Sequence, residues 1–414
     1  MATRQLNVYL HNKKVGILKE TPSSALSFKY APGVTTPISV RMPVREEVYS
    51  NKYAAPFFEN LTPEGTPRKN VAAHFGISEK NNFSILAKIG GDCAGAISLY
   101  PAEPDFTQVP DKEEVWDEDQ LATAIRSLPR NPLMVGLSNA PRLSLAGAQS
   151  KFVIHKDTKG NLWPSSETRP STHIIKVENP EYPTLLYNEL FCMKLAQKMW
   201  PRNSVDVQMK QVQGLKYLEI ERYDRANKDG AFVRVHQEDF CQVLGRLSSQ
   251  KYQEEGGPSI KQAYNALQEF TSASRAVDSM RFAQLLIFNF LIGNADAHAK
   301  NISLLHTERG VVLAPFYDLV STEAEDEKLS KTISMFIDGK RSYEEITRND
   351  FKNMFKSLGL NPERTLKDVL APMENILCVA KDLKNELNAS ELTKSSVYEQ
   401  IIALIERRQA VLFN

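Results

Sequence analysis

The chain has 414 residues, of which 42% are hydrophobic and 24% charged, a composition typical of a water-soluble globular protein with two or three domains. Its formal net charge of +1 excludes a general attraction to nucleic acid, so any contact with DNA would need a local patch or a partner. The spacing of the four cysteines is not that of metal ligands. We find neither a signal peptide nor an apolar run of the roughly 18 residues that a membrane span needs. We therefore expect a cytoplasmic protein without membrane contact.

The first part of the chain begins with strand-like runs at Leu6–Leu10 and Val15–Leu18, whose short polar connection predicts a hairpin. Further on, Phe57–Gly65 combines aromatic anchors with residues that end helices. The stretch Pro101–Asp119 is rich in proline and acidic residues, which is typical of a boundary between domains.

The middle of the chain is predicted to consist mainly of strands. Lys151–Ile154, His173–Val177 and Tyr217–Glu221 are short runs of β-forming residues. One helix interrupts them over Leu185–Met199, where apolar residues recur at helical spacing. After about residue 237 the chain is predicted to be mostly helical, so the whole has a two-lobed outline.

A dense polar cluster follows the apolar helix Phe282–Ile292 directly after Gly293. A buried helix holds the loop that follows it rigidly, which suits a catalytic loop. The cluster comprises Asp296, His298, Lys300 and Asn301, and Asp318 follows downstream.

The spacing of the two aspartates and the asparagine is the one that protein kinases use. In kinases the first Asp takes the proton of the attacked hydroxyl, while the Asn and the second Asp hold Mg²⁺ against the phosphates of ATP. Asp296 is therefore the candidate catalytic base, and Asn301 and Asp318 are the candidate metal ligands. A zinc site has little support, because His298 has no second histidine four residues later.

Candidates for binding the nucleotide lie upstream. Lys176 stands in an apolar strand, where its ammonium would contact ATP phosphates and pair with Glu189, unless Lys176 simply faces water and Glu189 is an ordinary exposed helix residue. The small residues of Ser144–Lys151 would let backbone N–H groups approach phosphates, although an ordinary turn before a strand has the same composition. Backbone groups of Glu221–Arg225 could contact adenine, or the segment could hold a structural Arg–Asp pair on the surface.

Together these motifs resemble the HipA family, the serine/threonine kinase toxins of bacterial HipBA toxin–antitoxin modules. The resemblance runs nearly end to end and includes Phe57–Gly65, which is typical of the extra amino-terminal subdomain of the family. The other motifs are Ser144–Gln149, Thr172–Lys176, Glu221–Arg225, Gln237–Gln242, Asp296–Asn301 and Phe316–Asp318.

The resemblance implies an α+β protein with a two-lobed protein-kinase-like fold. We expect an N-terminal α/β subdomain over 1–105, a kinase N-lobe with the ATP-binding loop over 106–236, and an all-helical C-lobe with the catalytic and metal-binding loops over 237–414. The residues expected to bind ATP are Ala146, Gly147, Ala148, Gln149, Ser150, Lys151, Lys176, Glu221, Arg222, Tyr223, His298 and Lys300.

The resemblance also implies autophosphorylation at Ser144, which opens the SxAGAQ segment, with Ser150 as a second candidate because well-known members carry Glu there. It implies a glutamyl-tRNA synthetase as the substrate and a HipB-like helix-turn-helix antitoxin as the partner, with operator DNA bound through their complex. Two alternatives remain: a small-molecule kinase, and a non-catalytic ATP-binding co-repressor. The intact Asp296, Asn301 and Asp318 argue against the co-repressor.

Overall fold

The computed structural model describes residues 4–106, 115–128, 151–166, 168–325 and 332–413. These residues form mixed helices and sheets, so the predicted α+β class is confirmed. Within the described ranges, no helix has the length and apolar character needed to cross a membrane.

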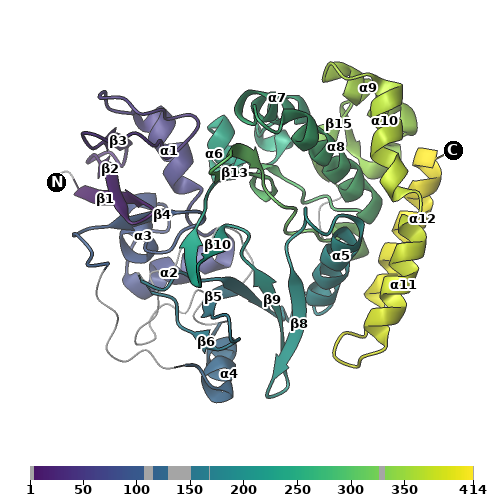
Figure 1. Cartoon of the computed structure of the whole chain (residues 1–414), viewed down its shortest axis with the longest axis horizontal. Helices are drawn as coiled ribbons and strands as arrows, with labels where there is room; N and C mark the ends of the chain where they lie inside the picture. The colour runs from purple at the N-terminus through teal and green to yellow at the C-terminus, as the bar shows by residue number, and fades with distance from the viewer. Residues whose placement is uncertain (1–3, 107–114, 129–150, 167, 326–331, 414) are drawn as a thin grey trace.

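The N-terminal part is an antiparallel sheet covered by three helices (Figure 1). Its first two strands form the predicted hairpin, and its core is a separate apolar cluster around Phe28, Phe57 and Phe58. The sheet order is β3-β2-β1-β4, with β1 Arg4–Leu10, β2 Lys13–Glu20, β3 Leu26–Tyr30 and β4 Ile97–Tyr100, and the helices are α1 Asn51–Glu59, α2 Gly65–Phe75 and α3 Asn82–Ile89.

A second antiparallel sheet, in the order β6-β5-β7-β9-β8, forms the middle of the molecule. Helix α5 (Leu185–Met199) has the predicted bounds and lies between this sheet and the C-terminal helices α11 and α12 (Figure 1). The strands are β5 Lys151–Lys156, β6 Leu162–Trp163, β7 His173–Val177, β8 Val207–Val212 and β9 Leu215–Glu221, and α4 is Glu118–Ser127.

The C-terminal lobe is built around α8 (Arg275–Ile292), whose apolar residues are buried as predicted. Its helices are α6 Phe240–Leu244, α7 Ile260–Phe270, α9 Arg348–Ser357, α10 Pro362–Leu370, α11 Ile376–Asn388 and α12 Val397–Phe413. The expectation that this lobe is all-helical is wrong, because short strands flank the loop that follows α8 and others lie further along the chain. The remaining strands are β10 Arg225–Lys228, β11 Ala231–Arg234, β12 His236–Asp239, β13 Ser303–Thr307, β14 Gly310–Leu313, β15 Thr332–Ile337 and β16 Lys340–Ser342.

Buried ion pairs join the N-terminal part to the rest of the molecule. The carboxylate of Asp92 lies 2.9 Å from Arg225 and 3.3 Å from Arg234, and it accepts a hydrogen bond of 2.7 Å from the hydroxyl of Ser171. Burial opposes the ionisation of Asp92, but the surrounding arginines outweigh it and hold its pKa well below the ordinary value. A charged group buried in this way fixes the two parts together, because separating them would leave it unpaired.

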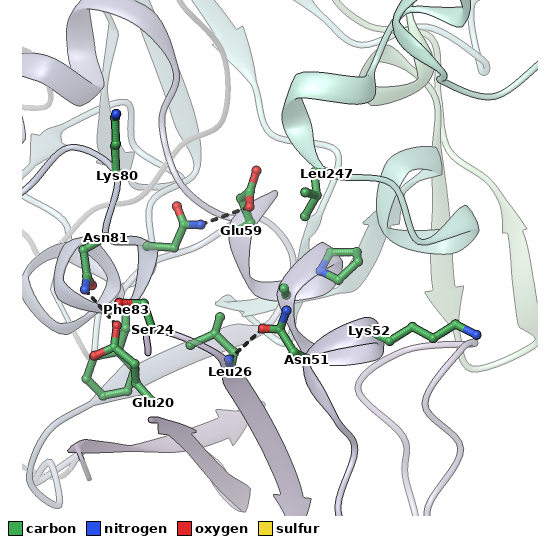
Figure 2. A pocket seen from close by; sticks show the side chains of 13 residues that line it. Glu20, Ser24, Leu26, Asn51, Lys52, Glu59, Lys80, Asn81, Phe83 and Leu247 are labelled. Carbon is green, nitrogen blue, oxygen red and sulfur yellow. Dashed lines mark hydrogen bonds between the residues drawn. The ribbon is translucent and has the colours of Figure 1, made fainter. Parts of the chain in front are cut away.

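A pocket of about 330 Å³ opens where the N-terminal part meets the helical lobe (Figure 2). Its carboxylates already have partners: Glu20 accepts a hydrogen bond from Asn81 at 2.7 Å, and Glu59 accepts one from Asn82 at 3.0 Å. Leu247 of the helical lobe closes one side. None of the site residues predicted from the sequence lines this pocket.

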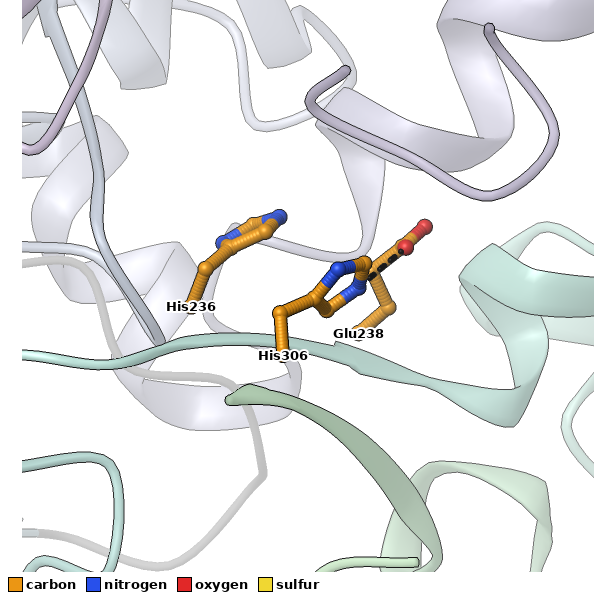
Figure 3. Close-up of side chains that lie close together, drawn as sticks. All are labelled: His236, Glu238 and His306. Atoms are coloured by element: carbon orange, nitrogen blue, oxygen red, sulfur yellow. Dashed lines mark hydrogen bonds and ion pairs between the residues drawn. The ribbon is translucent and has the colours of Figure 1, made fainter. Parts of the chain in front are cut away.

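A third junction holds the loop after β3 against β12 and β13 (Figure 3). His236 donates through Nε2 to the carbonyl of Ile38, and His306 donates through Nε2 to Glu238, each over 2.9 Å. Glu238 also accepts from the backbone N–H of Val40 at 2.9 Å. Metal-ligating atoms of the two histidines and Glu238 lie within 4.8 Å of one another, and the hydrogen bonds donated by both Nε2 atoms make the cluster a contact between the two parts.

Candidate active site

Lys176 lies at the centre of the site, on β7. Its Nζ is 2.6 Å from Glu189 and 2.6 Å from Asp318, and its side chain is only 6% exposed. Burial alone would lower the pKa of Lys176, but the two carboxylates raise it above the ordinary value, so the lysine stays charged. The alternative of a solvated lysine is therefore wrong, and the ion pair expected from the sequence is present.

Helix α5 presents Glu189 to this lysine because it packs against β9, the neighbour of β7, and against β8. Almost every residue of its first three turns is buried, Glu189 included. A carboxylate is buried in an apolar helix only where a cation compensates it. Lys176 is that cation.

Asp318 follows β14 and adopts a left-handed backbone conformation with φ of 56°. Asp tolerates this region better than most residues, yet such conformations occur mainly where the surroundings hold them, often at functional sites. One oxygen pairs with Lys176, while the side chain as a whole remains 41% exposed. The lysine holds the pKa of Asp318 well below its ordinary value despite burial, so Asp318 is ionised.

The loop that carries Asp296 begins where α8 ends at Gly293, whose φ of 75° forms a left-handed cap that returns its N–H to the helix. The next residues are fixed from the C-terminal lobe: Tyr343 donates to the carbonyl of Asn294 at 2.7 Å, and Thr322 accepts from the N–H of Ala295 at 2.8 Å. This support leaves Asp296 49% exposed at the surface of a rigid loop. The sequence predicted both the supporting helix and the loop.

The side chains of Asn301 and Tyr252 both donate hydrogen bonds to Asp296. Asn301 donates through Nδ2 to the carbonyl of Asp296 at 3.0 Å, which closes the loop on itself. The hydroxyl of Tyr252 donates to Oδ1 of Asp296 at 2.5 Å. Tyr252 is a site residue that the sequence did not reveal, because it lies 44 residues upstream outside any motif.

His298 and Lys300 point to different surroundings, although both belong to the predicted cluster. His298 is buried with its ring against Tyr252, at 5.2 Å between centroids, and its Nε2 lies 4.0 Å from Asp296. Burial lowers the pKa of His298, while the carboxylates of Asp296 and Asp318 act against that effect, so the ring is within electrostatic range of both acids.

Lys300 turns away from the Lys176 cluster. Its Nζ donates to Asn60 Oδ1 at 2.7 Å, and it lies 3.4 Å from Glu64 and 3.4 Å from Asp239. The structure therefore directs this ammonium to the N-terminal part of the chain instead of the expected nucleotide site.

Lys151 opens β5 and pairs in register with Lys176 on the adjacent strand. The remaining residues of the predicted phosphate loop, Ala146, Gly147, Ala148, Gln149 and Ser150, lie outside the described residues, as does Ser144. Burial lowers the pKa of Lys151 to about 8, and the neighbouring charge of Lys176 adds to this. Residues paired across adjacent strands point to the same side of the sheet, so both ammonium groups can contact one anion.

Nucleotide binding is expected to take up protons through Lys151. At pH 8 about half of the Lys151 side chains are uncharged, and phosphate oxygens beside them would raise the pKa, so each binding event should recruit about half a proton. Affinity should consequently fall as the pH rises above 8. Calorimetric titrations with ADP in buffers of different ionisation enthalpy measure this uptake. Equal uptake in wild type and in Lys151→Met would contradict the assignment.

The three residues of the segment Glu221–Tyr223 have different surroundings in the structure. The side chain of Glu221 is exposed, whereas Arg222 is buried and pairs with Asp224 at 2.8 Å, so the Arg–Asp pair weighed for this segment exists but is buried instead of lying on the surface. The ring of Tyr223 stacks on the ring of Tyr317, with 5.3 Å between the centroids. Tyr317 is the residue directly before Asp318. The side chains of Arg222 and Tyr223 thus stabilise the fold. The backbone groups of this segment are the ones that could contact adenine.

The predicted metal ligands have the chemistry that Mg²⁺ requires. Asn301 uses its amide N–H for the loop, which leaves Oδ1 as a ligand, and Asp318 is ionised and partly exposed. Hard oxygen donors of this kind, supplemented by phosphate oxygens and water, are typical of Mg²⁺ in phosphotransfer sites. The residues present therefore fit the metal.

Comparisons with known proteins agree with this geometry. The model for the HipA-like C-terminal domain matches residues 143–378, and that for the HipA N-terminal domain matches residues 6–100. Y4mE of Sinorhizobium fredii, named as a kinase, is 35% identical over 370 residues, covering 87% of each chain. The serine/threonine-protein kinase toxin HipA of Shewanella oneidensis is 32% identical over 316 residues, covering 73% of this chain and 70% of that protein.

The fold is also that of a solved HipA. The structure of Shewanella oneidensis HipA in complex with HipB and operator DNA superposes with a TM-score of 0.81 at 26% identity, covering 99% of this chain and 97% of that one. Domain models over most of the chain, relatives above 30% identity and the shared fold lead to one conclusion. The chain belongs to the HipA family.

Proposed function

We propose that this protein is a Mg·ATP-dependent serine/threonine protein kinase. The observation that carries the proposal is the buried bridge of Lys176 between Glu189 and Asp318. A strand lysine paired with a helix glutamate is the arrangement by which protein kinases position the ATP phosphates. The naming of relatives as kinases supports the same reading.

The proposed reaction assigns one role to each group. The substrate hydroxyl attacks the γ-phosphorus, its proton passes to a carboxylate oxygen of Asp296, and the bond from phosphorus to the leaving ADP oxygen breaks. Lys176 and Lys151 hold phosphate oxygens, and Asn301 and Asp318 would hold Mg²⁺. When bound, the metal supplies neutralisation of the charge that develops on the phosphates.

The proposed substrates include the protein itself. Phosphate on Ser144 would carry about −1.5 to −2 charges beside a loop meant for ATP phosphates, so repulsion would lower nucleotide affinity and inactivate the kinase. Ser150 is the second candidate position. The external substrate that the resemblance implies is a translation-related protein, glutamyl-tRNA synthetase.

The proposed partner is a HipB-like helix-turn-helix antitoxin that neutralises the kinase and brings the complex to operator DNA. Support comes from the similar HipA, which was solved with HipB and its operator. The net charge of +1 agrees with DNA contact that depends on a partner.

Mapping of phosphosites by mass spectrometry after incubation with Mg·ATP tests the proposal. We expect phosphate on Ser144 or Ser150 in the wild type and none in Asp296→Asn, and transfer to an added glutamyl-tRNA synthetase. Transfer to small alcohols with no protein phosphorylated would establish the small-molecule kinase instead. ATP binding without any transfer to these acceptors would favour the co-repressor.

A further inference from the structure

One segment of the N-terminal part, residues 59–64 between α1 and α2, contacts both sides of the catalytic loop. We infer that this segment is a positioning part of the catalytic centre, which holds Asp296 and Asn301 in place from outside the kinase lobes. The inference rests on the proposed function for the role of Asp296, but the contacts themselves do not. It gives the Phe57–Gly65 motif a role in catalysis.

The first contact reaches the loop through Lys300. This residue lies directly before Asn301, and its Nζ is enclosed by Asn60 Oδ1 at 2.7 Å, the Asn60 carbonyl at 3.1 Å and Glu64 at 3.4 Å. Asn60 is itself fixed, since its amide donates to the carbonyl of Arg246 at 2.8 Å. A buried lysine with these partners cannot shift without breaking a charge-assisted contact, so the end of the catalytic loop is tied to the N-terminal part.

The second contact reaches Asp296 through Lys251 and Tyr252. Glu64 Oε2 is 2.9 Å from Lys251 Nζ, and the carbonyl of Lys251 accepts from the N–H of Ala299 in the catalytic loop at 3.4 Å. The next residue is Tyr252, whose hydroxyl holds Asp296. Glu64 therefore fixes the segment that orients the proposed base.

A second carboxylate of the segment, that of Glu59, also contacts the stretch that carries Lys251 and Tyr252. Glu59 accepts a hydrogen bond of 2.9 Å from the hydroxyl of Ser248, three residues before Lys251, and one of 3.0 Å from the side-chain amide of Asn82. The segment thus touches the 248–252 stretch at two points. This stretch contains no strand and only short 3-10 turns, so its conformation depends on such outside contacts.

Glu64 is the most informative position because one carboxylate serves both contacts. Burial would raise its pKa, yet Lys300 and Lys251 lower it below the ordinary value, so Glu64 is charged between two lysines. Removing the charge leaves both ammonium groups without this partner. In the described structure the carboxylate of Glu64 pairs with Lys251 and Lys300, and its charge is only a minor influence on Lys151, so nucleotide binding should change much less than the transfer rate.

The test compares Glu64→Gln with Glu103→Gln, both full-length. Glu103 is also ion-paired with a lysine, Lys14 at 2.7 Å, but its side chain is 74% exposed and far from the loop in sequence. We expect Glu64→Gln to lower kcat by about 10-fold to 100-fold, because small misplacements of a catalytic group cost this much. The KM for ATP and the affinity for ADP should stay close to those of Glu103→Gln, whereas the thermal midpoint should fall below that of Glu103→Gln because two buried ammonium groups lose this partner.

Two further measurements keep the outcomes distinct. The double variant Glu64→Gln/Lys251→Met should be no slower than the single variants if Glu64 acts through Lys251. Amide hydrogen exchange of residues 294–302 should be faster in Glu64→Gln than in wild type, a readout that needs no activity and so remains valid if the kinase proposal fails. Unchanged kcat together with unchanged exchange would overturn the inference.

Discussion

Replacing Asp296 with Asn is expected to abolish phosphoryl transfer while leaving nucleotide binding nearly intact. The amide is isosteric and can still accept the hydrogen bond from Tyr252, so the loop should keep its shape. It cannot accept the proton of the attacking hydroxyl, and a general base contributes about 100-fold to 10,000-fold to the rate. Single-turnover transfer of labelled phosphate should fall by that factor, and calorimetric ADP affinity should change less than about two-fold, well below the 1.4 kcal/mol of a tenfold change.

A matched control is Asp229→Asn, on the exposed turn between β10 and β11. Both the rate and the affinity should be those of the wild type. A loss of ADP affinity in Asp296→Asn as large as its loss of rate would refute the role of Asp296 as a base that acts on the hydroxyl alone.

Replacing Asp318 with Ala should instead weaken binding of the magnesium–nucleotide complex. The change removes a charged oxygen ligand and one of the two carboxylates that hold Lys176, although Glu189 keeps the lysine compensated. Loss of support for a metal site typically costs 10-fold to 100-fold in affinity, about 1.4 to 2.7 kcal/mol. ATP titrations in the presence of Mg²⁺ and in the presence of EDTA separate the metal-dependent part of the ATP affinity from the metal-independent part.

The diagnostic result is a difference between those two titrations. Affinity should fall in Mg²⁺ and change little in EDTA. An equal fall under both conditions would assign Asp318 to ordering Lys176, and unchanged binding under both would remove it from the site. Alanine at a φ of 56° carries some strain, so Asp318→Asn, which tolerates that conformation, is the companion variant.

Local patterns in the sequence were sufficient for the elements that carry the chemistry. The periodicity of Leu185–Met199 gave a helix with the observed bounds, and the apolar run before Gly293 placed the catalytic loop at the end of a buried helix. Lys176 was identifiable because a charge inside an apolar strand needs a partner, and the helix that follows supplied Glu189.

The parts that sequence reasoning missed depend on contacts between distant segments. Tyr252 meets Asp296 across 44 residues, and Lys300 meets Asn60 across 240, with no local feature that indicates either contact. The same limit led to the assignment of Lys300 to the nucleotide, since its place in the cluster was visible but its direction was not. The short strands of the C-terminal lobe were underestimated because pairs such as β12 with β13 join segments far apart in the chain.

The buried arginine cluster around Asp92 has a consequence for synthesis on the ribosome. Asp92 emerges first, and its partner Arg225 follows 133 residues later, which at bacterial elongation rates is a delay on the order of 10 s. During that interval the N-terminal part carries the carboxylate of Asp92 without its arginine partners. The contact through Asp92 can therefore form only after Arg225 has left the exit tunnel, and the pair of Lys176 with Asp318 only after Asp318 has done so.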